Sequence, residues 1–151
     1  MPIATKNEKI DLSSEIQTEE FALRFSKKIK HQDIIFLYGE MGVGKTTFVR
    51  HLINKLQKAN NQIMTEVTSP TFNILNEYKI KKIKINHYDL YRLNSKDELK
   101  DLNLFGDKLN SITLIEWPQI IIKKPERLIE LKFKYEKDFK KRSVQIKGLI
   151  L

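Results

Sequence analysis

The stretch at residues 39–48, GEMGVGKTTF, constrains this chain most; it follows the apolar run IIFLY and leads into VRHLINKL. Its spacing, Gly39-x-x-x-x-Gly44-Lys45-Thr46, matches the phosphate-binding pattern G-x-x-x-x-G-K-[ST]. That pattern requires a strand before it and a helix after it, and both are predicted here. The glycines let successive backbone amides point inward, and the new helix turns its positive end toward phosphate. We therefore expect a bound nucleoside triphosphate.

Two side chains of this loop have expected chemical roles. Lys45 reaches the β- and γ-phosphates, and the Thr46 hydroxyl is a ligand for Mg²⁺. The sequence lacks the guanine motif N-K-x-D, since Asn54–Gln57 reads NKLQ, and no D-x-x-G follows a strand. These gaps argue against a Ras-like GTPase and favour ATP. The loop residues expected to contact the nucleotide are Gly39, Glu40, Met41, Gly42, Val43, Gly44, Lys45, Thr46 and Thr47.

A P-loop also needs an acidic group near the metal, and two predicted strand ends supply one. Glu116 ends the apolar run ITLIE, and Asp89 ends the alternating run before LYRL. Either carboxylate could instead be a solvated strand end. A glutamate reaches one methylene further, so it can contact Mg²⁺ through water or orient the attacking water. We predict Lys45, Asp89 and Glu116 as catalytic residues, and Thr46, Asp89 and Glu116 as the metal site.

Four further features each allow two interpretations. The segment Thr68–Phe72 (TSPTF) is either a switch that senses the γ-phosphate or metal, or an ordinary Ser-Pro turn. His87 is more typical of a buried strand histidine than of a catalytic group. Arg92 could stabilise transition-state charge or pair with a carboxylate. Trp117 could pack beside the nucleotide, but its chemistry alone favours the core.

The apolar periodicity predicts one α/β domain over residues 1–151. The expected architecture is a P-loop NTPase fold, with a mixed central sheet, flanking helices and partly antiparallel strands near the C-terminus. The first helix is capped by Ser14 or Thr18 and ends near Lys30. Two more helices are expected at residues 46–58 and 95–102, and strands at 34–38, 74–78, 83–88, 112–117, 128–135 and 143–150.

Composition excludes several classes of protein. The chain has no cysteine, which rules out disulfides, thiolate metal sites and cysteine nucleophiles. The N-terminal residues lack the apolar centre of a signal peptide. No apolar run approaches the roughly 20 residues that a membrane-spanning helix needs. A cytoplasmic protein that does not enter the membrane is expected.

The net charge of +9 also has two interpretations. It suggests a polyanionic partner such as RNA, because lysine and arginine displace phosphate counterions. However, only five of the 28 basic residues are arginine, which is typical of compositional drift toward A/T-rich codons. The charge is uneven: from Ile121 to the end there are ten basic and four acidic residues. A nucleic-acid or acidic partner, if there is one, is expected at that end.

Four segments in this order resemble the TsaE family, also called YjeE: GEMGVGKTTF, VTSPTFNILNEY, HYDLYRL and LIEWP. The stretch KDELKDLNLFGDKL is also similar to the acidic helix that follows in that family. The likeness spans about Thr18 to Gln119 and is weaker in the last two strands. Only the P-loop is specific by itself, but the four segments in this order are highly specific. Gln119 departs from the family, which often has a carboxylate after EWP.

The resemblance implies a one-domain ATPase that binds ATP and Mg²⁺ and acts with TsaD and TsaB. These partners transfer threonylcarbamoyl to adenosine 37 of tRNA, and ATP hydrolysis resets the complex between turnovers. By position, the resemblance assigns Lys45 and Thr46 to phosphate and metal, and Asp89 and Glu116 to Mg²⁺ or the attacking water. It also places four other residues at the nucleotide: Thr71 in the switch-like segment, Trp117, Arg142, and Thr18 near the adenine.

Two rival functions stay open at the level of sequence. A small-molecule kinase would use the same loop, but it needs an acceptor pocket and usually an arginine-bearing lid, and arginines are scarce here. An ATP-dependent switch could bind nucleic acid directly through the basic C-terminal third. Salt-dependent tRNA binding by the isolated protein would favour the switch.

Overall fold

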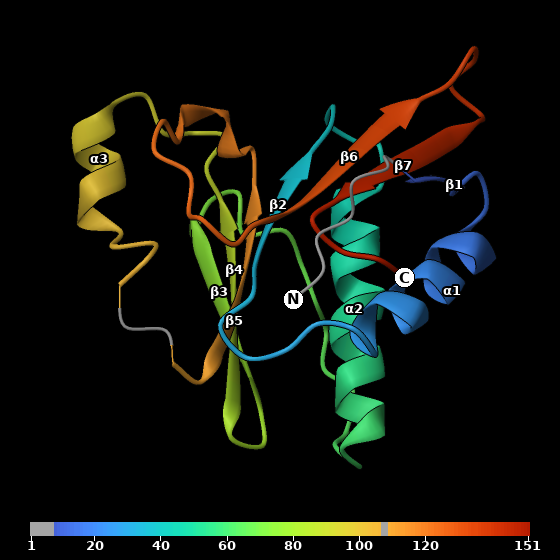
Figure 1. The fold of residues 1–151 in the computed structure, drawn as a ribbon, viewed down its shortest axis with the longest axis horizontal. Helices are drawn as coiled ribbons and strands as arrows, with labels where there is room; N and C mark the ends of the chain where they lie inside the picture. Colours follow the sequence, from blue (N-terminus) through green and yellow to red (C-terminus); the bar gives the residue numbers. More distant parts are fainter. Residues whose placement is uncertain (1–7, 107–108) are drawn as a thin grey trace.

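The computed structural model describes residues 8–106 and 109–151. Within them, seven strands form one sheet in the order β1-β7-β6-β2-β5-β4-β3 (Figure 1). The strands are β1 (Glu8–Asp11), β2 (Ile34–Tyr38), β3 (Leu75–Ile80), β4 (Ile83–Asp89), β5 (Ser111–Glu116), β6 (Ile129–Tyr135) and β7 (Arg142–Lys147). The helices are α1 (Glu15–Ser26), α2 (Lys45–Ala59), α3 (Lys96–Asp101) and the short 3₁₀ helix η1 (Pro118–Ile120).

The sheet is mixed, as the sequence predicts. Strands β4, β5, β2 and β6 run parallel to their neighbours in the centre of the sheet. Strand β3 pairs antiparallel with β4, and β7 pairs antiparallel with both β6 and β1. The expected α/β fold with antiparallel C-terminal strands is therefore confirmed. Because the central strands are parallel, their carboxyl ends meet at one edge of the sheet, where α/β proteins bind ligands.

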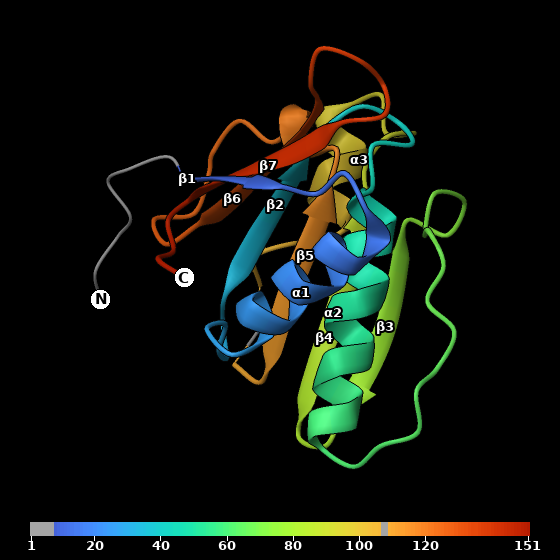
Figure 2. The ribbon, with the colours of Figure 1, turned by 90° about the vertical axis from the view of Figure 1, so that its right-hand side faces the viewer.

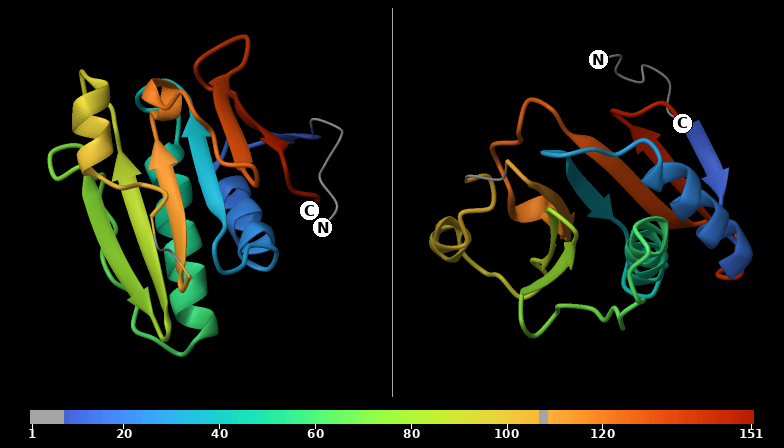
Figure 3. Two further views of the ribbon diagram at one scale, coloured as in Figure 1. Left: turned by 60° about the vertical axis from the view of Figure 1, so that its left-hand side comes forward. Right: turned by 90° about the horizontal axis from the view of Figure 1, so that it is seen from below.

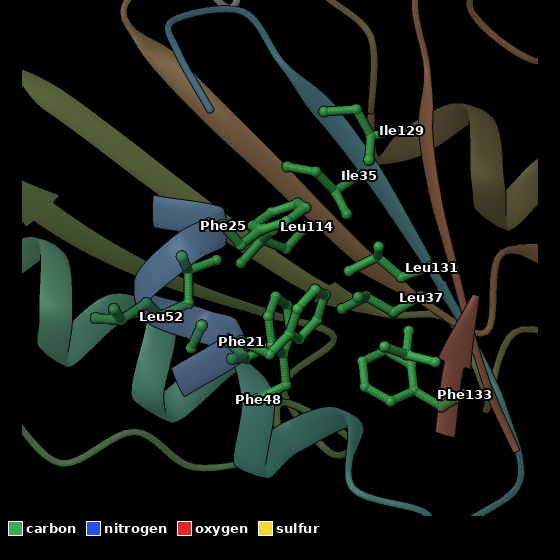
Figure 4. Packing of buried hydrophobic residues seen from close by; sticks show 14 of the residues in the cluster. Phe21, Phe25, Ile35, Leu37, Phe48, Leu52, Leu114, Ile129, Leu131 and Phe133 are labelled. Atoms are coloured by element: carbon green, nitrogen blue, oxygen red, sulfur yellow. The ribbon is translucent and has the colours of Figure 1, made fainter. Parts of the chain in front are cut away.

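Helices lie on both faces of the sheet. Figures 2 and 3 show α1 and α2 side by side on one face, with α3 on the other. The larger apolar core lies under α1 and α2 (Figure 4). In it, the ring of Phe48 contacts the rings of Phe21, Phe25 and Phe133, with centroids 5.1, 5.4 and 5.7 Å away. Phe48 lies in the first turn of α2, so this packing fixes the end of the helix that follows the glycine loop.

Several predicted boundaries differ from the structure, each for a local reason. Ser14, not Thr18, caps α1: its hydroxyl accepts from Gln17 N at 3.2 Å, and Gln17 Oε1 accepts from Ser14 N at 2.9 Å. The helix ends at Ser26, before the predicted Lys30, and the Lys30 amide donates to Asp33 Oδ2 instead. Trp117 lies outside β5, because its φ of 55° and ψ of 55° are left-handed. Strand β1 was not predicted.

Across the described residues, no helix combines the length and the apolar character needed to cross a membrane.

Candidate functional site

The glycine loop connects β2 to α2 and leaves the start of the helix open. Within the loop, Val43 N donates to the carbonyl of Glu40 at 3.2 Å, and Phe48 N donates to the carbonyl of Gly44 at 3.0 Å. Gly44 occupies the N-cap of α2, so no side chain caps the first amides. Free amides at the positive end of a helix dipole favour an anion such as phosphate.

The two predicted carboxylates lie directly opposite each other beside this loop. Asp89 ends β4 and Glu116 ends β5, and the parallel register pairs their Cα atoms. Strand β5 is also the neighbour of β2, with Leu37 paired to Glu116. Only 3% of Asp89 and 2% of Glu116 is exposed. Strand order therefore brings both acids to the carboxyl edge of the sheet, next to the start of α2.

Asp89 is held by the segment TSPTF and by its own turn. Thr71 Oγ1 donates to Asp89 Oδ2 at 2.9 Å, and Ser69 Oγ lies 3.4 Å from the same oxygen. The amide of Tyr91 donates to Asp89 Oδ1 at 2.9 Å. The two hydroxyls are 2.7 Å apart. The segment is therefore docked on a predicted site carboxylate, which an ordinary turn does not require.

Glu116 has a different partner, the side chain of His87. The distance from His87 Nε2 to Glu116 Oε2 is 2.6 Å, and both side chains are almost completely buried. His87 thus fits the interpretation of a buried strand histidine, but it contacts one of the predicted site residues directly.

Lys45 is folded back toward its own loop. Its Nζ donates to the carbonyl of Gly39 and lies 3.8 Å from the centroid of the Trp117 ring. Burial lowers the pKa of Lys45, while the nearby charges of Glu116 and Asp89 act in the opposite direction. Phosphate oxygens are stronger partners for an ammonium than a carbonyl and an aromatic ring, so they could replace Gly39 and Trp117 as partners of Lys45.

Trp117 belongs to the site and not to the core, which its chemistry alone had favoured. Its ring lies 4.8 Å from the ring of Tyr91, measured between centroids. A left-handed backbone is costly for a bulky residue, and such strain is concentrated at functional sites. Trp117 directly follows Glu116, and its left-handed backbone directs the indole ring back over Lys45.

These residues line a cavity of about 320 Å³ at the start of α2. Eleven predicted residues line it: Met41, Gly42, Gly44, Lys45, Thr46, Thr47, Thr71, Asp89, Glu116, Trp117 and Arg142. Gly39, Glu40 and Val43 belong to the loop but do not line the cavity. Thr18 does not line it either; its hydroxyl lies in α1, 3.4 Å from the carbonyl of Ser14.

Three lining residues need separate comment. Phe72 and Tyr91 were not proposed individually as site residues, although Phe72 ends the predicted segment TSPTF and Tyr91 lies within the motif HYDLYRL. Arg142 is at the start of β7, and a Cβ placed on Gly44 would lie 3.7 Å from its Nη1. Arg142 Nε is buried without a hydrogen-bond partner among the described residues. Arg92 does not line the cavity; its guanidinium lies 5.1 Å from the centroid of the Phe72 ring.

The donor atoms fit Mg²⁺ in the form that P-loop proteins use. Thr46, Asp89 and Glu116 offer hard oxygen ligands, which Mg²⁺ prefers. Among the described residues, no three histidine, aspartate or glutamate side chains converge as a complete metal cage. Mg²⁺ usually keeps several waters and takes phosphate oxygens as further ligands, so one or two carboxylates and a hydroxyl suffice.

Comparisons with known proteins place this chain in one family. The family model described as threonylcarbamoyl adenosine biosynthesis protein TsaE matches residues 12–144. A Rickettsia bellii protein named tRNA threonylcarbamoyladenosine biosynthesis protein TsaE is 40% identical over 136 residues, which is 89% of this chain and 92% of that one. A Borreliella burgdorferi protein of the same name is 38% identical over 129 residues, covering 80% and 89%.

A solved structure shows the same fold. The crystal structure of YdiB from Bacillus subtilis has a TM-score of 0.71, covering 99% of this chain and 89% of that chain at 22% identity.

Proposed function

Since this chain belongs to the TsaE family, as its sequence motifs indicated, we propose that it is an ATP-binding and ATP-hydrolysing protein of tRNA threonylcarbamoyladenosine biosynthesis. The observation that carries the ATPase proposal is the cavity at the start of α2. It combines a P-loop lysine, a helix terminus without a side-chain cap, and two buried carboxylates at adjacent strand ends.

Each part has a defined task in phosphoryl transfer. The amides at the start of α2 bind the phosphates, and Lys45 leaves Gly39 and Trp117 to pair with them. Thr46 and one or both carboxylates would hold Mg²⁺, which neutralises charge on the phosphates when bound. Glu116 is the acid at the end of the strand next to β2. We assign it the orientation of the attacking water, and Asp89 the support of the metal and of the segment TSPTF.

The docked segment supports a role as a switch. Ser69 and Thr71 hold Asp89 through their hydroxyls, so a ligand that recruits Asp89 must compete with this contact. Such competition links the state of the nucleotide to the position of an exposed segment that a partner can read.

The wider role that we propose follows the family. The protein acts with TsaD and TsaB in forming N6-threonylcarbamoyladenosine at position 37 of tRNA, in the cytoplasm. ATP hydrolysis here resets the complex between turnovers and does not carry out the transfer. A reset function fits a site in which Asp89, the acid that we assign to the metal, is bound by the hydroxyl of Thr71 in the exposed segment TSPTF.

Reconstitution with TsaB and TsaD tests this proposal. Tris-buffered mixtures with and without the protein are compared for multiple-turnover tRNA modification and for ATP hydrolysis. Lys45→Ala is expected to abolish nucleotide binding and multiple turnover. Lys58→Ala, on the exposed last turn of the same helix, is the matched control and should behave as wild type. Modification that proceeds equally well without the protein, or hydrolysis unchanged in Lys45→Ala, would refute the assignment.

A further inference from the structure

His87 lies on β4 on the same face as Asp89, since side chains two residues apart share a face of a strand. The parallel register pairs the Cα of His87 with that of Leu114, so the ring reaches diagonally to Glu116, two residues along β5. None of the His87 side chain is exposed to solvent. The ring therefore lies in the interior, directly behind a carboxylate that lines the cavity.

The chemistry of the contact fixes its direction. When Glu116 is ionised, its oxygens can only accept hydrogen bonds, so His87 Nε2 then carries the hydrogen and donates it to Glu116 Oε2. This holds whether the ring is neutral or protonated. The other nitrogen, Nδ1, is buried without a hydrogen-bond partner among the described residues. In the part of the chain that the structure describes, the only hydrogen bond of the ring is thus the one to Glu116.

We propose that His87 is a positioning residue for ATP hydrolysis: it holds Oε2 of Glu116 so that Oε1 faces the cavity and orients the attacking water. The proposal rests on the hydrolytic function assigned to Glu116 above. A glutamate side chain has three rotatable bonds, and a displacement of about 1 Å can cost about 100-fold in rate. A short bond from a rigid, fully buried ring removes that freedom from one end of the carboxylate.

Two amide substitutions separate this role from mere filling of the interior. In His87→Gln, the side-chain nitrogen can occupy the place of Nε2 and donate to Glu116. In His87→Asn, the nitrogen reaches only the place of Nδ1, so Glu116 loses its donor. Both variants bury a neutral amide, which makes Asn the matched control for Gln. His87→Met, which fills similar volume without a donor, is a second comparison in case the Asn variant does not fold.

The readouts are the kcat of steady-state ATP hydrolysis in the presence of TsaB and TsaD, the ATP affinity, and the melting temperature. We expect His87→Gln to retain kcat within about threefold, and His87→Asn and His87→Met to lose about 10- to 100-fold, with ATP affinity preserved in all three. In a Glu116→Ala background, the Asn substitution should cause no further loss of kcat, because the group that it positions is absent.

Three results would overturn the proposal. One is an equal loss of kcat in His87→Gln and His87→Asn, and another is a loss that appears in ATP affinity while kcat is unchanged. The third is wild-type kcat in His87→Asn; if wild-type hydrolysis itself is intact, that result removes the role of His87 and leaves the ATPase proposal standing. Absence of hydrolysis by the wild type would remove both.

Discussion

Replacing Gly39 by alanine is expected to destabilise the protein far more than the same change at Gly42, in the same loop. Gly39 has a φ of +148°, and a Cβ added there would lie 2.8 Å from the carbonyl oxygen of Phe133 and 2.8 Å from Val43 Cγ1. Gly42 also has a positive φ, +80°, but its added Cβ would meet only the hydroxyl of Tyr135, at 3.5 Å. Gly42→Ala therefore introduces backbone strain alone, whereas Gly39→Ala introduces backbone strain and a steric clash, so comparing the two substitutions isolates the cost of the clash.

The magnitudes follow from these two surroundings. A residue forced into a sparsely populated backbone region costs about 1–3 kcal/mol. Overpacking against a fixed backbone atom adds about 1–3 kcal/mol. Gly39→Ala should therefore lose about 4 kcal/mol, and Gly42→Ala about 1–2 kcal/mol for its left-handed backbone. The difference of about 2.5 kcal/mol corresponds to about 5–10 °C in melting temperature for a domain of this size.

The assay is denaturant unfolding of the nucleotide-free wild type and both variants. A slope of the free energy against denaturant concentration that is the same in all three proteins shows that only stability has changed. Equal destabilisation by the two substitutions would refute the reasoning. It would mean that β6, which carries Phe133, moves away from the loop at little cost, and that the loop is not held by its packing against that strand.

Three further predictions concern charged groups and aromatic rings: two of them lie in the site, and the third is at Glu130 on β6, which does not line the cavity. ATP should change the fluorescence of Trp117, the only tryptophan, because Lys45 leaves its ring; a nucleotide titration should show no such change in Lys45→Ala. Burial lowers the pKa of Lys45, so the unfolded state binds more protons between that pKa and 10.5, and stability should rise with pH through this window. Urea unfolding at several pH values should show that increment in the wild type and not in Lys45→Met. Burial of Glu130 opposes ionisation, but hydrogen bonds from Tyr38 and Lys124 lower its pKa below 4.5. The stabilisation from these hydrogen bonds is present above pH 4.5 and is lost as the pH falls through the lowered pKa of Glu130. Tyr38→Phe should therefore lower the free energy of unfolding by about 1–2 kcal/mol at neutral pH. Unfolding measured at acidic pH should show a smaller difference between the variant and the wild type.

The elements that the sequence predicts well are those whose signals are local. The strand before Gly39 was predicted from a short apolar run, and the helix after Lys45 from apolar residues at helical spacing. The loop pattern between them requires both elements, which strengthened the two predictions. The four-residue strand β1 was not predicted, because its evidence is its pairing with β7, more than 130 residues away. Short edge strands carry too few side chains to show an alternating pattern.

The site divides in the same way. Asp89 and Glu116 were recognisable as acids at strand ends, but their facing each other depends on strand order, which no local pattern encodes. The chemistry of Trp117 alone favoured the core, and only the family resemblance placed it at the nucleotide; its left-handed backbone turns the ring onto Lys45. Predicting the contact between His87 and Glu116 would have required the register between β4 and β5 and the face on which each side chain lies. The features of the site that could not be predicted from the sequence are therefore mostly those set by pairing between distant strands.

Asp89 and Glu116, the two candidates for the direct metal ligand, differ in the hydrogen bonds that their oxygens already make. Both oxygens of Asp89 are engaged, one by hydroxyls of TSPTF and the other by the amide of Tyr91. Direct ligation by Asp89 Oδ2 must displace Thr71, which makes the position of the segment depend on the metal. Within residues 8–106 and 109–151, the hydrogen bond of Glu116 to His87 engages Oε2, so Glu116 can act through Oε1 without breaking that bond. The acid on the strand beside the P-loop is thus suited to a constant role in orienting water. The acid one strand further out is suited to reporting which nucleotide is bound, because its partners must rearrange when it takes a new ligand.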